Sequence, residues 1–136
     1  MLEQTFSITG EVTNTDVFVI KGDGSVGIGT SKTTGYQLSV EEKIRAREID
    51  VNLTAWSDFV FKDNYTLQPL NELETYIANN KHLPDVPTEK EVLANGVSLG
   101  KMNAILLQKV EELTLYMIAI NKRMKALEEE NKQLKK

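Results

Sequence analysis

The sequence predicts an α+β chain with strands in its N-terminal part, a small mixed region after them, and a long C-terminal helix. Residues 5–54 contain stretches in which polar and apolar residues alternate, and they are rich in Thr, Val, Ile, Ser and Gly, which is typical of short strands joined by tight turns. Helical spacing of apolar residues begins at Leu67, and from Leu99 such residues recur every seven positions. We therefore expect a β-rich segment, a small mixed domain and a coiled-coil helix, over residues 1–54, 55–98 and 99–136.

Composition excludes several classes of function. The 136 residues carry a net charge of −4, so there is no basic field to attract nucleic acid or anionic lipid. The chain has no cysteine, which excludes disulfides and thiolate metal sites. Its longest apolar run, Leu115–Ile120, is too short to cross a bilayer. We expect no nucleic-acid partner, no membrane insertion, no metal site and no cofactor.

The strands are predicted from alternation between turn-forming residues. The stretches "TFSITGEV" and "DVFVIKGDGSV" alternate in this way. We interpret Gln37–Val40 as a further strand, and Ile44–Leu53 as another whose outer face carries charged residues. A short helix over Glu41–Arg47 is the alternative to the beginning of that last strand.

A glycine-rich loop within this part has the spacing of a dinucleotide-binding motif. Gly22, Gly24 and Gly27 form G-x-G-x-x-G, a pattern that binds pyrophosphate only where a helix begins at the third glycine. The following "IGTSKTTGYQLSV" is a poor helix former. We therefore interpret the stretch as a hairpin, with Asp23 and Gly24 in a type I′ turn between "VFVI" and "SVGIG".

Two further glycines suggest close packing of the backbone. Gly27 and Gly29 leave one face of their strand nearly bare, as happens where the backbones of neighbouring chains approach closely. The residues to which we assign this structural role are Gly22, Asp23, Gly24, Gly27 and Gly29.

Two short helices are predicted in the middle of the chain. The stretch "LNELETYIANNKH" has apolar residues at positions 70, 73, 76 and 77. Pro84 and Pro87 then interrupt the pattern. Thr88 and Glu91 have the spacing of a capping box, which starts a helix that ends near Gly96. The aromatic residues at positions 56, 59, 61, 65 and 76 are expected to be mostly core.

The C-terminal repeat predicts a coiled coil of five heptads. One apolar stripe on a helix of about 50 Å cannot remain in water, so the helix needs partners. Met at a with Leu at d does not distinguish a dimer from a trimer, whereas Arg123 at g and Glu128 at the next e favour a parallel arrangement. The alternative is one long helix folded against its own chain. The d positions are Leu99, Leu106, Leu113, Ile120, Leu127 and Leu134; the a positions are Asn103, Val110, Met117, Met124 and Asn131.

Additional apolar residues widen the stripe in the first half of this helix. They indicate that the first half packs on other structure, while the final "KRMKALEEENKQLKK" projects as a plain coil. These residues are Ile105, Leu107, Leu115, Tyr116 and Ile118.

The chain resembles a known family over roughly residues 20–130. "GSVGIGTSKTTGYQLSVEEKIRAREIDV" is similar to a repeat near the C-terminus of phage and Bacteroidetes tail-fibre-like proteins, and the stretch from "WSDFVFKDNYTLQPL" onward is similar to their C-terminal domain. The resemblance implies an elongated homotrimer, in which a β-rich shaft of three intertwined chains is followed by a parallel three-stranded coiled coil. It also implies a place in a virion tail fibre or a cell-surface fibre, with a host or cell-surface glycan or protein as partner.

The same resemblance implies a possible self-cleavage. Tail-spike proteins carry C-terminal intramolecular chaperones with the pattern Ser-Asp-x-x-x-Lys, which occurs here as Ser57, Asp58 and Lys62. In that family the serine is the nucleophile and the lysine its general base, so the bond at risk would be Trp56–Ser57. Such a lysine must lose its proton, which requires apolar surroundings. On a strand, residues 57 and 62 point to opposite faces, and Ser57 with Asp58 are equally turn residues that open a strand.

Three functions are therefore compatible with the sequence. The first is a non-enzymatic module that trimerises a fibre and forms its tip, and the heptad residues favour it. The second is the self-cleaving chaperone. The third is an adaptor whose coiled coil pairs with a different protein.

Overall fold

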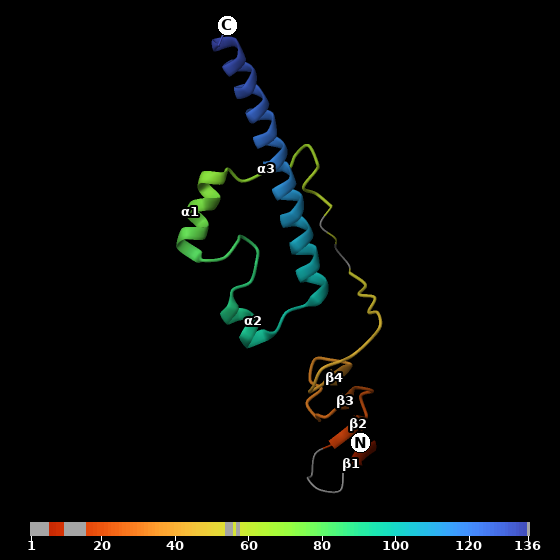
Figure 1. Cartoon of the computed structure of the whole chain (residues 1–136). Coiled ribbons are helices and arrows are strands. Elements are labelled where there is room, and N and C mark those ends of the chain that lie inside the picture. The colour runs from red at the N-terminus through yellow and green to blue at the C-terminus, as the bar shows by residue number, and fades with distance from the viewer. Residues whose placement is uncertain (1–5, 10–15, 54–55, 57, 136) are drawn as a thin grey trace. The chain divides into compact units, whose positions relative to one another are not determined.

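Figure 1 shows a computed structural model of the chain, which describes residues 6–9, 16–53, 56 and 58–135. The described residues form an α+β structure with a small sheet and a long C-terminal helix, as predicted. The chain divides into two compact units, Met1–Ile49 and Asp50–Lys136. The predicted middle region and the long helix thus lie within one unit.

The first unit contains one sheet with the strand order β1-β2-β3-β4. β1 and β2 pair antiparallel, as do β2 and β3, whereas β3 and β4 run parallel. The antiparallel pair β2 and β3 forms the predicted hairpin, in which Ile20 lies opposite Val26. The strands are β1 (Phe6–Thr9), β2 (Asp16–Ile20), β3 (Val26–Ile28) and β4 (Leu38–Val40).

The turn of this hairpin differs from the predicted type I′. The N–H of Gly24 donates to the carbonyl of Lys21 at 2.9 Å, and the N–H of Lys21 donates to the carbonyl of Ser25 at 2.9 Å. Only Gly24 has a positive φ, of 83°, while Asp23 does not, whereas a type I′ turn needs positive φ at both central residues. The carboxylate of Asp23 instead accepts bonds from the N–H and hydroxyl of Ser25 at 2.9 and 2.7 Å, which hold the turn in this form.

Gly27 is required by a contact within its own chain. A side chain there would collide with the carbonyl oxygen of Thr30, so the close approach expected from a neighbouring chain is made by the same chain. Gly29 has a φ of 71° and belongs to the turn that follows β3. Beside this turn, the hydroxyls of Ser25 and Thr33 are both buried and lie 2.8 Å apart.

The predicted strand over Ile44–Leu53 is wrong, and so is the alternative helix over Glu41–Arg47. Residues 41–53 form neither strand nor helix. A strand requires a neighbour for its backbone hydrogen bonds, and no described segment pairs with this one. Its apolar side chains are open as well, since Ile44 and Ile49 are each more than half exposed.

Two short helices occur in the second unit where the sequence predicts them. α1 spans Leu70–Asn80 and ends at Lys81, which has a left-handed φ of 64° and donates its N–H to the carbonyl of Ile77. α2 spans Glu89–Asn95 and begins with the predicted capping box. In it, the N–H of Thr88 donates to the Glu91 carboxylate at 2.8 Å, and the Thr88 hydroxyl accepts the N–H of Glu91 at 3.3 Å.

The long helix α3 spans Leu99–Leu134, in agreement with the prediction. Its first turn packs on the extended chain near the start of the second unit. Gly100 is buried there, and a side chain at this position would collide with Leu53 and lie close to Val51. The extended segment therefore lies against the beginning of α3.

Little of the chain is buried. Among the residues whose burial the structure describes, only Val19 and Val60 are buried apolar side chains. No residue of α1 or α2 is buried. The aromatic residues expected in a core are open instead, with Trp56, Phe59 and Phe61 exposed and Tyr65 and Tyr76 half-buried. The described residues thus form only a small apolar core.

Candidate functional site

An apolar seam runs along α3. Between 46% and 85% of each residue's surface is exposed, so the residues predicted to mediate oligomerisation are open to a partner. They follow the a and d positions of the heptads, which keeps them on one side of the helix. The seam consists of Leu99, Leu106, Val110, Leu113, Met117, Ile120, Met124, Leu127 and Leu134.

The remaining faces of the first half of α3 are largely covered by the chain itself. Between Leu99 and Tyr116, the exposed positions outside the a and d sets are Lys101 and Thr114. Ile105 and Leu107 are half-buried, as are Leu115 and Tyr116, which agrees with the predicted packing. Ile118 is 46% exposed and departs from it. From Met117 to Lys135 every residue is exposed, so this half projects as predicted.

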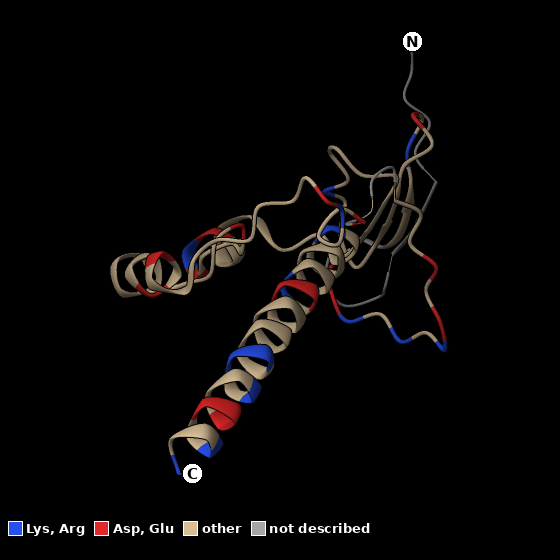
Figure 2. Ribbon diagram, turned by 90° about the horizontal axis from the view of Figure 1, so that it is seen from above, with Lys and Arg blue, Asp and Glu red and all other residues tan. Residues whose placement is uncertain are grey.

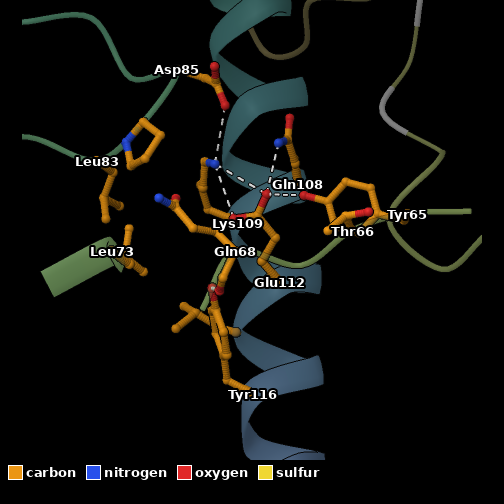
Figure 3. A pocket seen from close by; sticks show the side chains of 12 residues that line it. Tyr65, Thr66, Gln68, Leu73, Leu83, Asp85, Gln108, Lys109, Glu112 and Tyr116 are labelled. Carbon is orange, nitrogen blue, oxygen red and sulfur yellow. Dashed lines mark hydrogen bonds and ion pairs between the residues drawn. The ribbon is translucent and has the colours of Figure 1, made fainter. Parts of the chain in front are cut away.

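A polar network lies on the covered side of α3, centred on Glu112 (Figure 3). The hydroxyl of Tyr65 donates to Glu112 Oε1 at 2.6 Å, and Gln108 Nε2 donates to the same oxygen at 2.8 Å. Lys109 Nζ lies 3.1 Å from Glu112 Oε2 and 3.5 Å from Asp85 Oδ2. The side chains of Lys109 and Glu112 are only 12% and 14% exposed. The network therefore connects the segments of Tyr65 and Asp85 to α3.

The electrostatics of this network fit a structural clamp. Burial raises the pKa of Glu112, but the hydrogen bonds from Tyr65, Gln108 and Lys109 outweigh it and leave the pKa below its ordinary 4.5. Burial, together with the hydrogen bond to the Glu112 carboxylate and its charge, raises the pKa of Tyr65 to about 12. At neutral pH the carboxylate is thus ionised and the tyrosine protonated, which is the pairing that a strong hydrogen bond needs.

Tyr116 forms a second link on the same side. Its hydroxyl donates to the carbonyl of Gln68 at 2.6 Å, and burial followed by the charge of Glu112 raises its pKa. The sequence alone did not predict the Glu112 network. Its one local signal is the spacing of Gln108 and Lys109, four and three residues before Glu112, which places all three on one side of a helix.

A pocket of about 160 Å³ opens between α1 and α3 beside this network (Figure 3). Leu73 of α1, Leu83 of the following loop and Leu113 of α3 form an apolar part of its lining. Lys109, Glu112 and Tyr116 form a polar part. Because Leu113 also belongs to the seam, the pocket and the seam are continuous.

The structure describes only one member of the predicted serine–lysine pair. Ser57 lies outside the described residues, and the side chain of Lys62 is exposed, without the apolar surroundings that a general-base lysine requires. The N–H of Lys62 donates to the carbonyl of Phe59 at 3.1 Å, and the N–H of Tyr65 donates to the carbonyl of Lys62 at 2.9 Å. The described residues from Phe59 to Tyr65 therefore form turns, and the interpretation of "FVFK" as a strand is wrong.

Other types of site find no support in the described part of the chain. No three residues among its His, Asp and Glu side chains converge in a way that could hold a metal ion. Its longest helix is not apolar enough to span a membrane, and neither is any other that was described. Basic and acidic residues alternate along α3 (Figure 2), which gives no continuous basic stripe for nucleic acid.

Comparisons with known proteins found no match to this chain among protein-family models, curated proteins or solved structures.

Proposed function

We propose that this chain is a non-enzymatic assembly module in which three identical copies join through the seam of α3 as a parallel coiled coil. The observation that carries the proposal is that the first half of α3 is covered on its other sides while its apolar a and d positions stay open. A helix folded against its own chain would hide this stripe. The number three and the role in a fibre come from the resemblance to tail-fibre-like proteins.

The exposed area supports an assembly of this kind. Nine apolar side chains of the seam are each 46–85% exposed. Covering them with a second and third copy would remove apolar surface from water, which is the favourable term in association.

Assembly through α3 would also act on the β-rich part. Residues 41–49 are extended and exposed without a described partner strand. Pairing such segments between chains is slow, because distant residues must first be brought together. A coiled coil that holds three chains in register lowers this entropic cost. We therefore assign to α3 the alignment of an intertwined shaft, whose end then presents a surface for a host or cell-surface glycan or protein.

Light scattering with matched variants tests the proposal. Glutamate at Ile120 and Leu127 places two charges in the seam, whereas glutamate at Ala119 and Ala126 places the same charges at exposed positions outside it. We expect the unaltered chain and the Ala119→Glu/Ala126→Glu variant to have three times the mass of the 15.3 kDa chain, and the Ile120→Glu/Leu127→Glu variant to be monomeric. A monomeric unaltered chain would refute assembly, and one that becomes helical only with another protein would favour the adaptor.

A further inference from the structure

The pocket between α1 and α3 has the size and position to receive part of a second copy of the chain. Its volume is about 160 Å³, and an apolar cavity of about 150 Å³ accommodates one benzene ring. It opens beside the seam, because Leu113 lines both. A neighbouring chain that binds to the seam therefore comes close to the mouth of the pocket.

The two sides of α3 differ in a way that suits a cyclic arrangement. Lys109 and Tyr116, which line the pocket, occupy g positions. Gly100 occupies an e position, and the extended segment with Leu53 packs there. In a parallel coiled coil the g side of each helix faces the e side of the next. Three copies related by rotation would thus place the pocket of each chain beside the extended segment of its neighbour.

The segment that follows Leu53 carries an exposed phenylalanine at a suitable level. Phe61 is 61% exposed in a turn. Phe59, two residues earlier, has its ring 5.8 Å from that of Tyr65, whose hydroxyl binds Glu112, at the level of the pocket. In Figure 1, α1 lies on one side of α3 and the yellow-green loop with this turn on the other. Because the chains of a parallel coiled coil are level with one another, Phe61 is level with the neighbour's pocket.

From these relationships we infer that the phenyl ring of Phe61 inserts into the pocket between α1 and α3 of the neighbouring chain. The inference rests on the proposed trimer and adds a second contact outside the coiled coil. It brings a partner to the side of α1 that carries Leu73, the residue of this helix that lines the pocket. It also accounts for the absence of buried residues in α1, because the ring of another chain would pack against this helix.

Photo-crosslinking from position 61 tests the insertion. Phe61 is replaced by p-azidophenylalanine, and equal amounts of ¹⁵N-labelled and unlabelled chains are refolded together before illumination. We expect crosslinked peptides that join position 61 to α1 or to residues 83–85. If labelled and unlabelled chains assemble at random, about half of these crosslinked peptide pairs should combine one labelled and one unlabelled peptide, which shows that the crosslink joins two chains. The matched probe at exposed Tyr36 is expected to give no crosslink to α1.

The outcomes separate this inference from the proposed function. A trimer in which position 61 crosslinks only within one chain, or only outside the pocket, overturns the inference and leaves the trimer intact. A monomer by light scattering overturns the trimer itself. Thermal unfolding gives an independent measurement: we expect Phe61→Ala to lower the melting temperature of the trimer more than Trp56→Ala does. If Trp56→Ala lowered the melting temperature more than Phe61→Ala, the pocket would be assigned to Trp56 and the role of Phe61 would be refuted.

Discussion

The hydroxyl of Tyr65 donates a 2.6 Å hydrogen bond to the carboxylate of Glu112, 47 positions later in the chain. This bond joins a turn to the covered side of α3, while the opposite side carries the seam. Gln108 and Lys109 bind the same carboxylate, so the helix supplies two of the three donors. The network therefore fixes which side of α3 is covered by its own chain and which stays open.

Removing the tyrosine hydroxyl should weaken the second unit without changing the residues of the seam. In Tyr65→Phe the carboxylate of Glu112 keeps two donors, so we expect a loss at the lower end of the range for one hydrogen bond to a charged group, about 1.5–3 kcal/mol. Urea denaturation at equal chain concentration measures the loss, because assembly adds to apparent stability. The exposed Tyr36 gives the control Tyr36→Phe, which should change stability by less than about 0.5 kcal/mol. Equal losses in both variants would show that the bond contributes nothing.

The network also predicts acid sensitivity. The pKa of Glu112 in the folded chain lies below its ordinary 4.5, so the unfolded chain binds a proton at Glu112 more readily. The stabilisation is thus complete above the unfolded pKa and is lost as pH falls through the folded pKa. We expect the stability of the unaltered chain to fall below about pH 4.5 more steeply than that of Glu112→Gln. Urea midpoints measured from pH 7 to pH 3 provide the comparison.

Exposed Glu74 supplies the matched control for the acid experiment. Glu74→Gln removes the same charge from α1, away from the network, and should leave the slope of stability against pH as steep as in the unaltered chain. If Glu112→Gln were equally steep, the carboxylate would not be the group that titrates.

The contact between Gly100 and Leu53 predicts a rescue in a double variant. Alanine in place of glycine favours a helix by up to about 1 kcal/mol, but its methyl group would collide with Leu53, and overpacking costs about 1–3 kcal/mol. We expect Gly100→Ala to be neutral or destabilising in the unaltered chain and stabilising when combined with Leu53→Ala. Thermal unfolding of the four chains gives the coupling energy. Additive effects would mean that the two residues do not touch.

The sequence predicted those elements whose signals are local. The capping box at Thr88 and Glu91 and the repeat from Leu99 are each defined by residues three to seven positions apart, and both helices form as expected. The hairpin also forms, but its turn type was wrong, because the carboxylate of Asp23 binds Ser25. The preference of Asp-Gly pairs for this turn type does not reveal that the aspartate side chain can instead form hydrogen bonds with a nearby residue.

What the sequence did not predict depends on contacts between distant residues. The alternation over Ile44–Leu53 suits a strand, but a strand forms only where another segment supplies hydrogen bonds. Glu112 meets Tyr65 through the course of the whole intervening chain, and no spacing rule connects two such positions. The aromatic residues from Trp56 to Phe61 suggested a core, yet they are largely exposed, because burial depends on what is packed against them.

Asn103 provides a test of how the seam specifies its partners. It occupies an a position and is exposed in the single chain, so in a parallel trimer the three amides would meet at one level and bind one another. A polar residue at a specifies register and number of strands at a cost in stability. We expect Asn103→Leu to raise the melting temperature of the assembly and to yield species other than trimers in native mass spectra. Gln133→Leu, at an exposed c position on the side of the helix away from the interface, should leave the number of chains unchanged. If Asn103→Leu forms trimers alone with unchanged stability, Asn103 does not face the other chains, and the assignment of the a positions to the interface fails at this heptad.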